Sequence, residues 1–311
     1  MNNIKTKFSI KDLENLSGIK AHTIRIWEKR YNLLQPNRSN TNIRYYSLNS
    51  LQKILNISYL NKNGYKISKI AKLKLEEIHL LVKDISENGL ENSSTINAFK
   101  MSMFSFDQSL FYSTFDKLAS EYSFKNLFYN FIVPFLDEIG VLWQTNTITP
   151  AHEHFIVGLI KQKILTNTEN AIRSNKDQNK DQTYVLFLPD NEIHELGLLF
   201  INYELTHRGL HNIYLGQSVP IDSLEYLKDY YKNITFISSF TVNPKSDIMD
   251  SYLEEFYEKL LKNTNNEFHV SGRQTSIINT NTIHDKISVS KSTEDILKNL
   301  SFNNQKLVKV I

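Results

Sequence analysis

The sequence predicts a multidomain protein that combines α and α/β domains, and three observations predict it. Residues 1–75 hold 15 Lys and Arg against 3 Asp and Glu, whereas the remaining residues hold 21 against 30. Residues 93–171 carry apolar side chains at helical spacing with few Gly or Pro. From residue 183 onward, short apolar runs alternate with helical segments, which is typical of a parallel sheet covered by helices on both faces. A chain of 311 residues is longer than one core usually covers, so we expect domains at residues 1–83, 90–172 and 182–311.

The composition narrows the classes of function. The chain contains no Cys, which excludes disulfide scaffolds, thiolate zinc sites, iron–sulfur clusters and cysteine nucleophiles. No apolar run approaches the roughly 18 residues of a membrane span, and residues 1–20 do not form a signal-peptide core. We therefore expect a soluble cytoplasmic protein with no membrane partner. The basic first quarter indicates a segment that binds nucleic acid.

The first helical segment has the start signal of a helix-turn-helix. Ser9 is a suitable N-cap, Asp12 lies three residues later as in a capping box, and Gly18 supplies the turn. The following helix is expected to have two faces. Its apolar residues Ile24, Trp27 and Tyr31 would be buried, and His22, Arg25 and Lys29, with Arg30 beside them, would face outward. A helix with an apolar back and a basic front suits the major groove of DNA, although a basic stripe alone is also common on solvated helices.

Three strings narrow this interpretation. The strings TIRIWEKRY at 23–31, PNR at 36–38 and IRYY at 43–46 closely resemble the MerR family of winged helix-turn-helix regulators, and WEKRY resembles the branch whose effector domain binds cobalamin. The resemblance implies a double-stranded DNA operator as partner and a homo-oligomer, dimer or tetramer; residues 66–83 or the later domains would supply its contacts. The wing turn at 40–42 reads Asn-Thr-Asn where the family often has Gly, and Asn tolerates the left-handed backbone that a hairpin needs. By the resemblance, Arg25 and Arg30 would contact DNA from the recognition helix, and Arg38, Arg44 and Tyr45 would anchor the wing to phosphates. His22, Thr23 and Lys29, on the same helix, complete the expected DNA contacts.

The middle segment is predicted to form four helices, near 93–104, 106–122, 123–143 and 149–170. The third ends at Trp143 and the fourth begins with Thr149 as N-cap and Pro150 in the first turn. Trp143 is compatible with a core aromatic, and the His152-Glu-His154 run is compatible with a solvated first turn. The spacing from Trp143 to Glu153-His154 resembles the four-helix-bundle cap of cobalamin modules in the photoreceptor branch of the MerR family. By that resemblance, Trp143, Glu153 and His154 would line the chamber over the upper face of the corrin.

One position departs from the light-sensing members of that branch. A His commonly follows the Trp in them and can take the upper cobalt position after light breaks the cobalt–carbon bond, but this chain has Gln144. An amide is a much poorer cobalt ligand than an imidazole, so light sensing is left open, with His152 or His154 as substitutes.

The last segment is predicted to be a Rossmann-like, flavodoxin-like domain after a polar linker at 170–182. Its expected strands are at 183–188, 211–215, 234–238 and 268–270, and its helices at 194–208, 221–231, 245–261 and 293–300. A histidine on the loop after the first strand lies at the carboxyl edge of the sheet, where such folds bind ligands, although a lone surface His is the commoner case.

The spacing Glu192-x-His194-x-x-Gly197 resembles the Asp-x-His-x-x-Gly motif of base-off, histidine-on cobalamin-binding domains. That resemblance implies a cobalamin cofactor, with His194 as lower cobalt ligand and Glu192 as the group that orients it. Together with the resemblance of the four-helix cap, it makes adenosylcobalamin the expected form. Gly197 would let the nucleotide tail pass. Two degenerate strings follow in the expected order, and they add Ser239 and Thr241, then Ser271 and Gly272, to the expected cofactor site.

The sequence therefore leads to one hypothesis and three alternatives. The hypothesis is a cytoplasmic transcriptional regulator acting as a repressor, without enzymatic turnover, in which adenosylcobalamin assembles the DNA-competent oligomer and photolysis releases it. The alternatives are a regulator of the same fold that works without cobalamin, a cobalamin-binding regulator insensitive to light, and a corrinoid methyltransferase subunit. The DNA-binding motifs at 8–46 argue against the last alternative, because a corrinoid methyltransferase subunit does not need to bind DNA.

Overall fold

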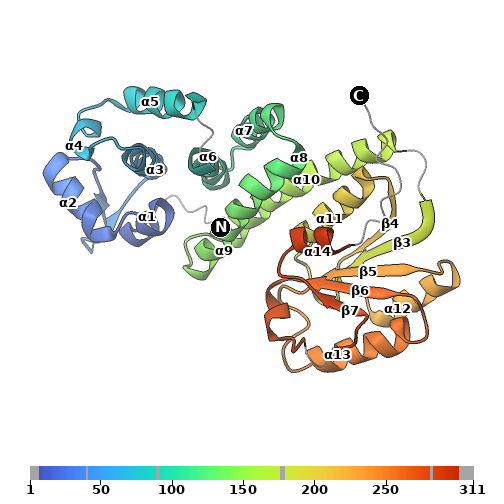
Figure 1. Ribbon diagram of the computed structural model, residues 1–311. Helices are drawn as coiled ribbons and strands as arrows, with labels where there is room; N and C mark the ends of the chain where they lie inside the picture. Colours follow the sequence, from blue (N-terminus) through green and yellow to red (C-terminus); the bar gives the residue numbers. More distant parts are fainter. Residues whose placement is uncertain (1–6, 40, 89–91, 176–178, 281–282, 301–311) are drawn as a thin grey trace. The chain divides into compact units, whose positions relative to one another are not determined.

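The computed structural model describes residues 7–39, 41–88, 92–175, 179–280 and 283–300, and the chain forms two compact units, Met1–Ile160 and Lys161–Ile311 (Figure 1). Within the described residues, no helix combines the length and apolar character needed to cross a membrane.

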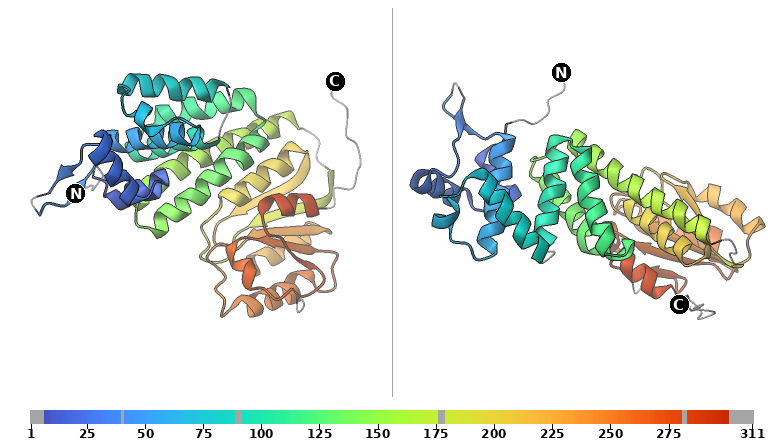
Figure 2. Two further views of the ribbon diagram at one scale, coloured as in Figure 1. Left: turned by 60° about the vertical axis from the view of Figure 1, so that its left-hand side comes forward. Right: turned by 90° about the horizontal axis from the view of Figure 1, so that it is seen from above.

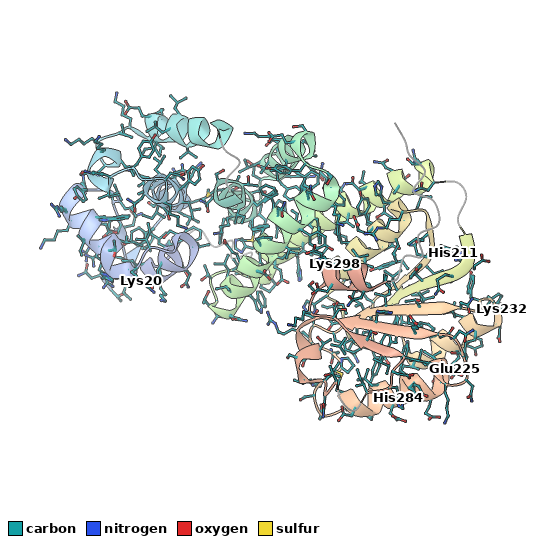
Figure 3. The ribbon with its side chains drawn as sticks, viewed as in Figure 1. Lys20, His211, Glu225, Lys232, His284 and Lys298 are labelled. Atoms are coloured by element: carbon teal, nitrogen blue, oxygen red, sulfur yellow. The ribbon has the colours of Figure 1, made fainter. Side chains whose placement is uncertain are left out.

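The first unit begins with a winged helix-turn-helix. Its elements are α1 (Ile10–Ser17), α2 (Ala21–Tyr31), the two-stranded wing of β1 (Asn37–Arg38) and β2 (Arg44–Tyr45), α3 (Leu48–Lys62), α4 (Ile67–Ile70) and α5 (Leu75–Asn88). The predicted capping box is confirmed, because Ser9 and Asp12 exchange both side-chain-to-backbone bonds. Gly18 ends α1 with φ at +73°, a left-handed conformation that glycine adopts without steric cost. Lys20 then lies at the surface of the turn into α2 (Figure 3).

The buried face of α2 is narrower than predicted. Ile24 is fully buried, but Trp27 and Tyr31 are only half-buried. The apolar cover of this small domain comes instead from Phe8, Leu33 and Tyr46, which lie outside α2 and are buried. Their packing could not be deduced from the periodicity of α2 alone.

A helical bundle completes the first unit and confirms the four predicted helices (Figure 2). It consists of α6 (Asn92–Ser105), α7 (Gln108–Glu121), the run α8 (Phe124–Leu127), η1 (Phe128–Ile132) and α9 (Val133–Gln144), and α10 (Pro150–Ser174), which continues beyond residue 160. Aromatic rings fill its core: Phe99 packs against Phe111 at 5.3 Å and Phe135 at 5.4 Å between ring centroids.

The second unit is a five-stranded parallel sheet with the strand order β4-β3-β5-β6-β7. The strands are β3 (Asn179–Phe187), β4 (Leu210–Gly216), β5 (Ile234–Ser239), β6 (Glu267–Ser271) and β7 (Ile287–Val289). The helical elements are α11 (Leu196–His207), α12 (Ile221–Glu225) with η2 (Tyr226–Asp229), α13 (Met249–Phe256) with η3 (Tyr257–Leu261), η4 (Arg273–Ile277) and α14 (Thr293–Asn299). In order of appearance the strands follow the 2-1-3-4-5 arrangement of flavodoxin-like folds, as predicted.

Alternation along β3 explains how both faces of the sheet are covered. Tyr184 and Leu186 pack with residues of α11 and α14, whereas Val185 and Phe187 pack with residues of α12, α13 and η3. Figure 1 shows these helix pairs on opposite sides of the strands. A strand that is buried on both faces gives the continuous apolar run seen in the sequence.

Two predicted segments in this unit had wrong boundaries, and one strand was not predicted. Most of the expected linker at 170–182 is structured, because α10 runs to Ser174 and β3 begins at Asn179; residues 176–178 lie outside the described residues. The Asn175 side chain donates to the carbonyls of Thr206 and His207, which anchors the end of α10. The helix expected at 245–261 begins only at Met249, and the short edge strand β7 was not predicted.

Candidate functional site

The outward face of α2 is basic, as the sequence predicted. His22, Arg25, Lys29 and Arg30 are exposed, and Thr23 is half-buried. Asn32, in the left-handed conformation, caps the C-terminus of this helix, and Gly18 ends the preceding helix α1 in the same conformation. A short exposed helix with this charge is suited to phosphates and base edges in the major groove.

The wing is tied to α2 through a residue that sequence reasoning did not single out. Glu28 accepts a hydrogen bond from the Tyr46 hydroxyl at 2.5 Å, and its other oxygen lies 3.9 Å from the Arg44 guanidinium. The wing turn is also closed as predicted, since Asn42 has φ at +62° and accepts a hydrogen bond from Arg38 at 2.7 Å. The sequence did contain a sign of this role: Glu28 is an acidic residue among the basic residues of α2, which indicates a cationic or hydrogen-bonding partner.

The second cluster lies where the strand order reverses. β3 is flanked by β4 on one side and β5 on the other, so the loops leaving β3 and β5 border the switch point at which α/β sheets bind ligands. Glu192 and His194 lie on the loop after β3, and Thr241 lies on the loop after β5.

Glu192 joins these two loops. One carboxylate oxygen accepts from the His194 Nδ1 at 2.5 Å and from the backbone amides of Ile193 and His194 at 2.9 and 3.0 Å. The other accepts from the backbone amides of Thr241, Val242 and Asn243 at 3.0, 2.6 and 2.9 Å. The carboxylate therefore fixes the His194 ring and closes the β5 loop at the same time.

The environment keeps Glu192 ionised. Its side chain is fully buried, and burial alone would raise its pKa. The hydrogen bonds from His194 and from the amides of Asn243, Val242 and His194 outweigh this effect and lower the pKa to about 2. His194 itself keeps 45% of its side chain exposed, so its ring is anchored at Nδ1 and open on the solvent side of the loop. Imidazoles that ligate metals are commonly held by a carboxylate in the same way.

The remaining predicted cofactor residues surround this edge. Ser239 is buried at the end of β5, and Thr241 is half-buried. Ser271, at the end of β6, is buried, and its hydroxyl has no hydrogen-bond partner among the residues that the structure describes. A buried hydroxyl without a partner is costly, and a polar ligand group at this edge would satisfy it.

The two glycines of the predicted site have structural reasons of their own. A Cβ on Gly272 would come within 2.5 Å of the Phe240 carbonyl oxygen, and its φ is +112°. A Cβ on Gly197 would lie 3.1 Å from the Thr293 side chain of α14. The backbone of Phe240 therefore leaves no room for a side chain at position 272. At position 197 a side chain would be tight but would meet only the Thr293 side chain.

An apolar rim accompanies these polar groups. Four aliphatic side chains in the segments that follow β3, β5 and β6 are exposed: Ile193 by 62%, Val242 by 46%, Ile248 by 49% and Ile277, in η4, by 45%. Exposed apolar residues gathered at one edge of a fold are typical of a ligand or partner surface.

The residues predicted from the bundle belong to the first unit. Trp143, at the end of α9, is 45% exposed; Glu153 is half-buried and His154 exposed in the first turn of α10. His152 is fully buried, with its ring 5.0 Å from that of Phe106 and 5.2 Å from that of Phe104, and its Nδ1 lies 2.8 Å from the Thr149 hydroxyl. The suggestion that His152 substitutes as a cobalt ligand was therefore wrong, because it is a core residue that caps α10.

Comparisons with known proteins also distinguish a DNA-binding segment from a cobalamin-binding segment. The family described as MerR HTH family regulatory protein matches residues 8–77, and the family described as B12 binding domain matches residues 95–165. The chain is 26% identical to the HTH-type transcriptional repressor CarH of Myxococcus xanthus over 215 residues, 67% of this chain and 70% of that protein. It is 25% identical to CarA of the same organism over 219 residues, 70% of each protein.

The fold is also similar to a solved structure. The monomethylamine corrinoid protein of Methanosarcina barkeri matches with a TM-score of 0.54 at 11% identity, over 67% of this chain and 97% of that one. At such low identity the match concerns the fold alone. The chain therefore carries a DNA-binding domain of the MerR type, followed by a B12-binding domain, and it is similar over about two thirds of its length to two transcriptional repressors.

Proposed function

We propose that this protein is a transcriptional repressor that binds its operator as a homo-oligomer and uses adenosylcobalamin as its effector. The observation that carries the proposal is the Glu192–His194 pair at the switch point of a domain joined to a basic recognition helix. The similarity to two named repressors supports the sign of regulation.

The residues at the sheet edge fit such a cofactor in three ways. His194 offers an imidazole whose tautomer and orientation are fixed by an ionised carboxylate. Ser239 and Ser271 offer buried hydroxyls for the nucleotide tail, and Thr241 lies beside them. The exposed aliphatic rim offers apolar cover for the flat macrocycle. From the bundle, Trp143, Glu153 and His154 would hold the upper side.

Light sensing is a second part of the proposal and depends on the position after Trp143. When bound, adenosylcobalamin supplies a cobalt–carbon bond that visible light breaks. Gln144, exposed after Trp143, presents an amide where light-sensing members have an imidazole, and His152 is fully buried. These two observations favour the second candidate function, a regulator that binds adenosylcobalamin but is insensitive to light.

The decisive experiment is to mix the purified chain with adenosylcobalamin in the dark, separate it by gel filtration and record the absorption spectrum of the protein peak. We expect co-elution with a spectrum of histidine-ligated cobalt. His194→Ala should lose that spectrum, and His207→Ala, an exposed histidine at the far end of α11, should keep it.

The outcomes separate the parts of the proposal. Absence of cofactor from the wild-type peak would overturn the cobalamin hypothesis. If the cofactor binds but green light changes neither the oligomer size nor DNA retention, the light-insensitive candidate stands.

A further inference from the structure

The DNA-binding domain and the helical bundle of the first unit meet where α3 packs against α6, and also at α1 and at Phe8 just before it. Phe8 packs edge-to-face on Phe104 of α6, with 5.3 Å between ring centroids. The Asn15 amide donates to the Thr147 hydroxyl at 3.1 Å, and Thr147 lies on the turn between α9 and α10. Both bundle partners are distant in sequence, so these contacts form only when α1 is docked on the bundle.

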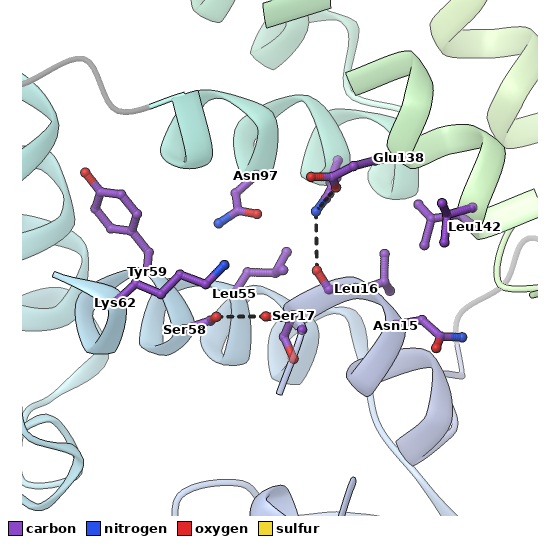
Figure 4. A pocket seen from close by; sticks show the side chains of 13 residues that line it. Asn15, Leu16, Ser17, Leu55, Ser58, Tyr59, Lys62, Asn97, Glu138 and Leu142 are labelled. Atoms are coloured by element: carbon purple, nitrogen blue, oxygen red, sulfur yellow. Dashed lines mark hydrogen bonds and ion pairs between the residues drawn. The ribbon is translucent and has the colours of Figure 1, made fainter. Parts of the chain in front are cut away.

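The third contact is a buried ammonium. Lys100 on α6 is 5% exposed and donates to the Leu16 carbonyl of α1 at 3.3 Å, and it also pairs with Glu138 of α9. Figure 4 shows Leu16 and Glu138 on opposite walls of the same pocket. A buried ammonium is costly unless its hydrogen bonds are made, so Lys100 is satisfied best while α1 stays in place.

The joint is nevertheless incompletely packed. A cavity of about 210 Å³ remains there, and its walls include the polar side chains of Asn15, Ser58, Lys62 and Asn97. Polar, partly hollow contacts between domains hold less tightly than an apolar core, so this joint is suited to open and close.

The turn that holds Asn15 is the turn that begins at Trp143. Asn146 donates its backbone amide to the Trp143 carbonyl at 3.0 Å, and the Thr145 and Thr147 hydroxyls lie 2.9 Å apart. A ligand that contacts Trp143 would therefore touch the same turn that holds Asn15.

We propose that the docking of α1 through Lys100, Asn15 and the 143–147 turn couples cofactor binding to operator binding. This inference rests on the proposed function. Docking leaves His22, Arg25, Lys29 and Arg30 exposed, so it does not block DNA. Instead it holds the recognition helix rigidly to the bundle. In an oligomer, rigid holding raises the effective concentration of the second recognition helix at its half-site, and a loose joint lowers it.

Operator binding tests the coupling. An operator fragment recovered by in-vitro selection with the full chain is titrated with and without adenosylcobalamin in the dark. Asn15→Ala combined with Glu138→Gln should reduce the cofactor-dependent gain in affinity by about fivefold, within the usual range of coupling between sites. Asp137→Asn, the same charge change on the exposed neighbour, should leave the gain unchanged, and cofactor co-elution should be equal in all variants.

A spectroscopic measurement tests the docking directly. The absence of native Cys allows spin labels at Lys11→Cys on α1 and Ser120→Cys on α7, both exposed. Without cofactor we expect the wild type to show two interlabel distances, one docked and one longer, and adenosylcobalamin in the dark should shift it to the docked distance alone. The Asn15→Ala, Glu138→Gln variant should show mainly the longer distance.

Each outcome has one meaning. A wild-type distribution that lacks the docked distance, or a variant that keeps it as the main distance, would overturn the docking. A variant that shows mainly the longer distance with an undiminished cofactor effect would overturn the coupling. A wild type that binds no cofactor, or shows no cofactor effect on DNA, would overturn the proposed function and with it the coupling, whatever the spin labels report.

Discussion

Glu192 shows how one residue determines the geometry of a loop pair. The family resemblance suggests Asp at this position, and Glu is one methylene longer. The longer side chain lets one oxygen stay with His194 while the other reaches three successive amides of the β5 loop. Without this carboxylate, no hydrogen bond described above would connect the His194 ring to the loop after β5.

The low pKa of Glu192 makes a pH-dependent prediction. A carboxyl whose pKa falls from 4.5 to about 2 on folding stabilises the protein above pH 4.5, and this contribution is lost as the pH falls through 2. Its size is roughly 3 kcal/mol. Urea unfolding should show Glu192→Gln less stable than the wild type by about that amount at pH 7, with the difference shrinking at pH 3. A difference independent of pH would mean that lost packing, not charge, explains the effect.

Gly272 makes a second prediction at the residue scale. Gly272→Ala would place a Cβ 2.5 Å from the Phe240 carbonyl oxygen at a φ of +112°, so we expect a loss of about 3 kcal/mol in the free energy of unfolding. Gly158→Ala is the control, because that glycine lies in α10, where an added Cβ would meet no atom within 4 Å outside its own helix backbone, and it should gain up to about 1 kcal/mol. Thermal unfolding measures both, and equal effects would contradict the packing argument.

At the scale of elements, the recognition helix and the wing work as one piece. Glu28 lies on α2, and its partners Arg44 and Tyr46 lie in or next to β2. The basic face and the wing therefore keep a fixed spacing on a DNA backbone. Helix periodicity could not reveal this bond, because it joins residues 18 positions apart.

Removal of that bond should weaken DNA binding without touching a DNA-facing side chain. Tyr46→Phe removes the hydroxyl that donates to Glu28 and should cost about 1.5 kcal/mol of stability, the value of a hydrogen bond to a charged group. Operator affinity should fall about threefold as the wing loosens, because only part of that energy is expressed in binding. Tyr65→Phe, in the turn after α3, is the control for both measurements. Unchanged affinity alongside lower stability would show that the wing position does not depend on Glu28.

At the scale of the whole molecule, basic and acidic residues are concentrated in different parts of the chain. The basic excess lies in residues 1–75 and the acidic excess in the rest of the chain, so the overall charge of +3 hides the feature that matters. An acidic remainder favours contact with DNA through the N-terminal domain alone.

This division predicts a steep dependence of operator binding on salt. The slope of log affinity against log salt should fall by about 1 in Arg25→Ala, together with a loss of affinity, because one phosphate or base contact is removed. Lys232→Ala makes the same charge change on the surface of the second unit and should alter neither value. If the two variants behave alike, net charge rather than the α2 face governs binding.

The sequence by itself determined the domain order, most of the elements and the chemistry of the candidate residues. Capping signals, helical periodicity and apolar strands are local patterns, so they can be recognised without knowing which segments meet. The motif around His194 was recognisable for the same reason. Boundaries failed where a distant contact decided them, as at Asn175 and at the short strand β7.

Only the tertiary structure decided which predicted residues have partners and which lie in the core. In the structure, His152 packs among aromatic rings, and Glu192 accepts hydrogen bonds from the backbone amides of a second loop. The Phe240 backbone lies too close to Gly272 for any side chain, and Lys100 of the bundle donates a hydrogen bond to α1. Each of these facts depends on contacts between residues that are far apart in the chain. Burial, pKa and strain are properties of such contacts, and a linear pattern does not contain them.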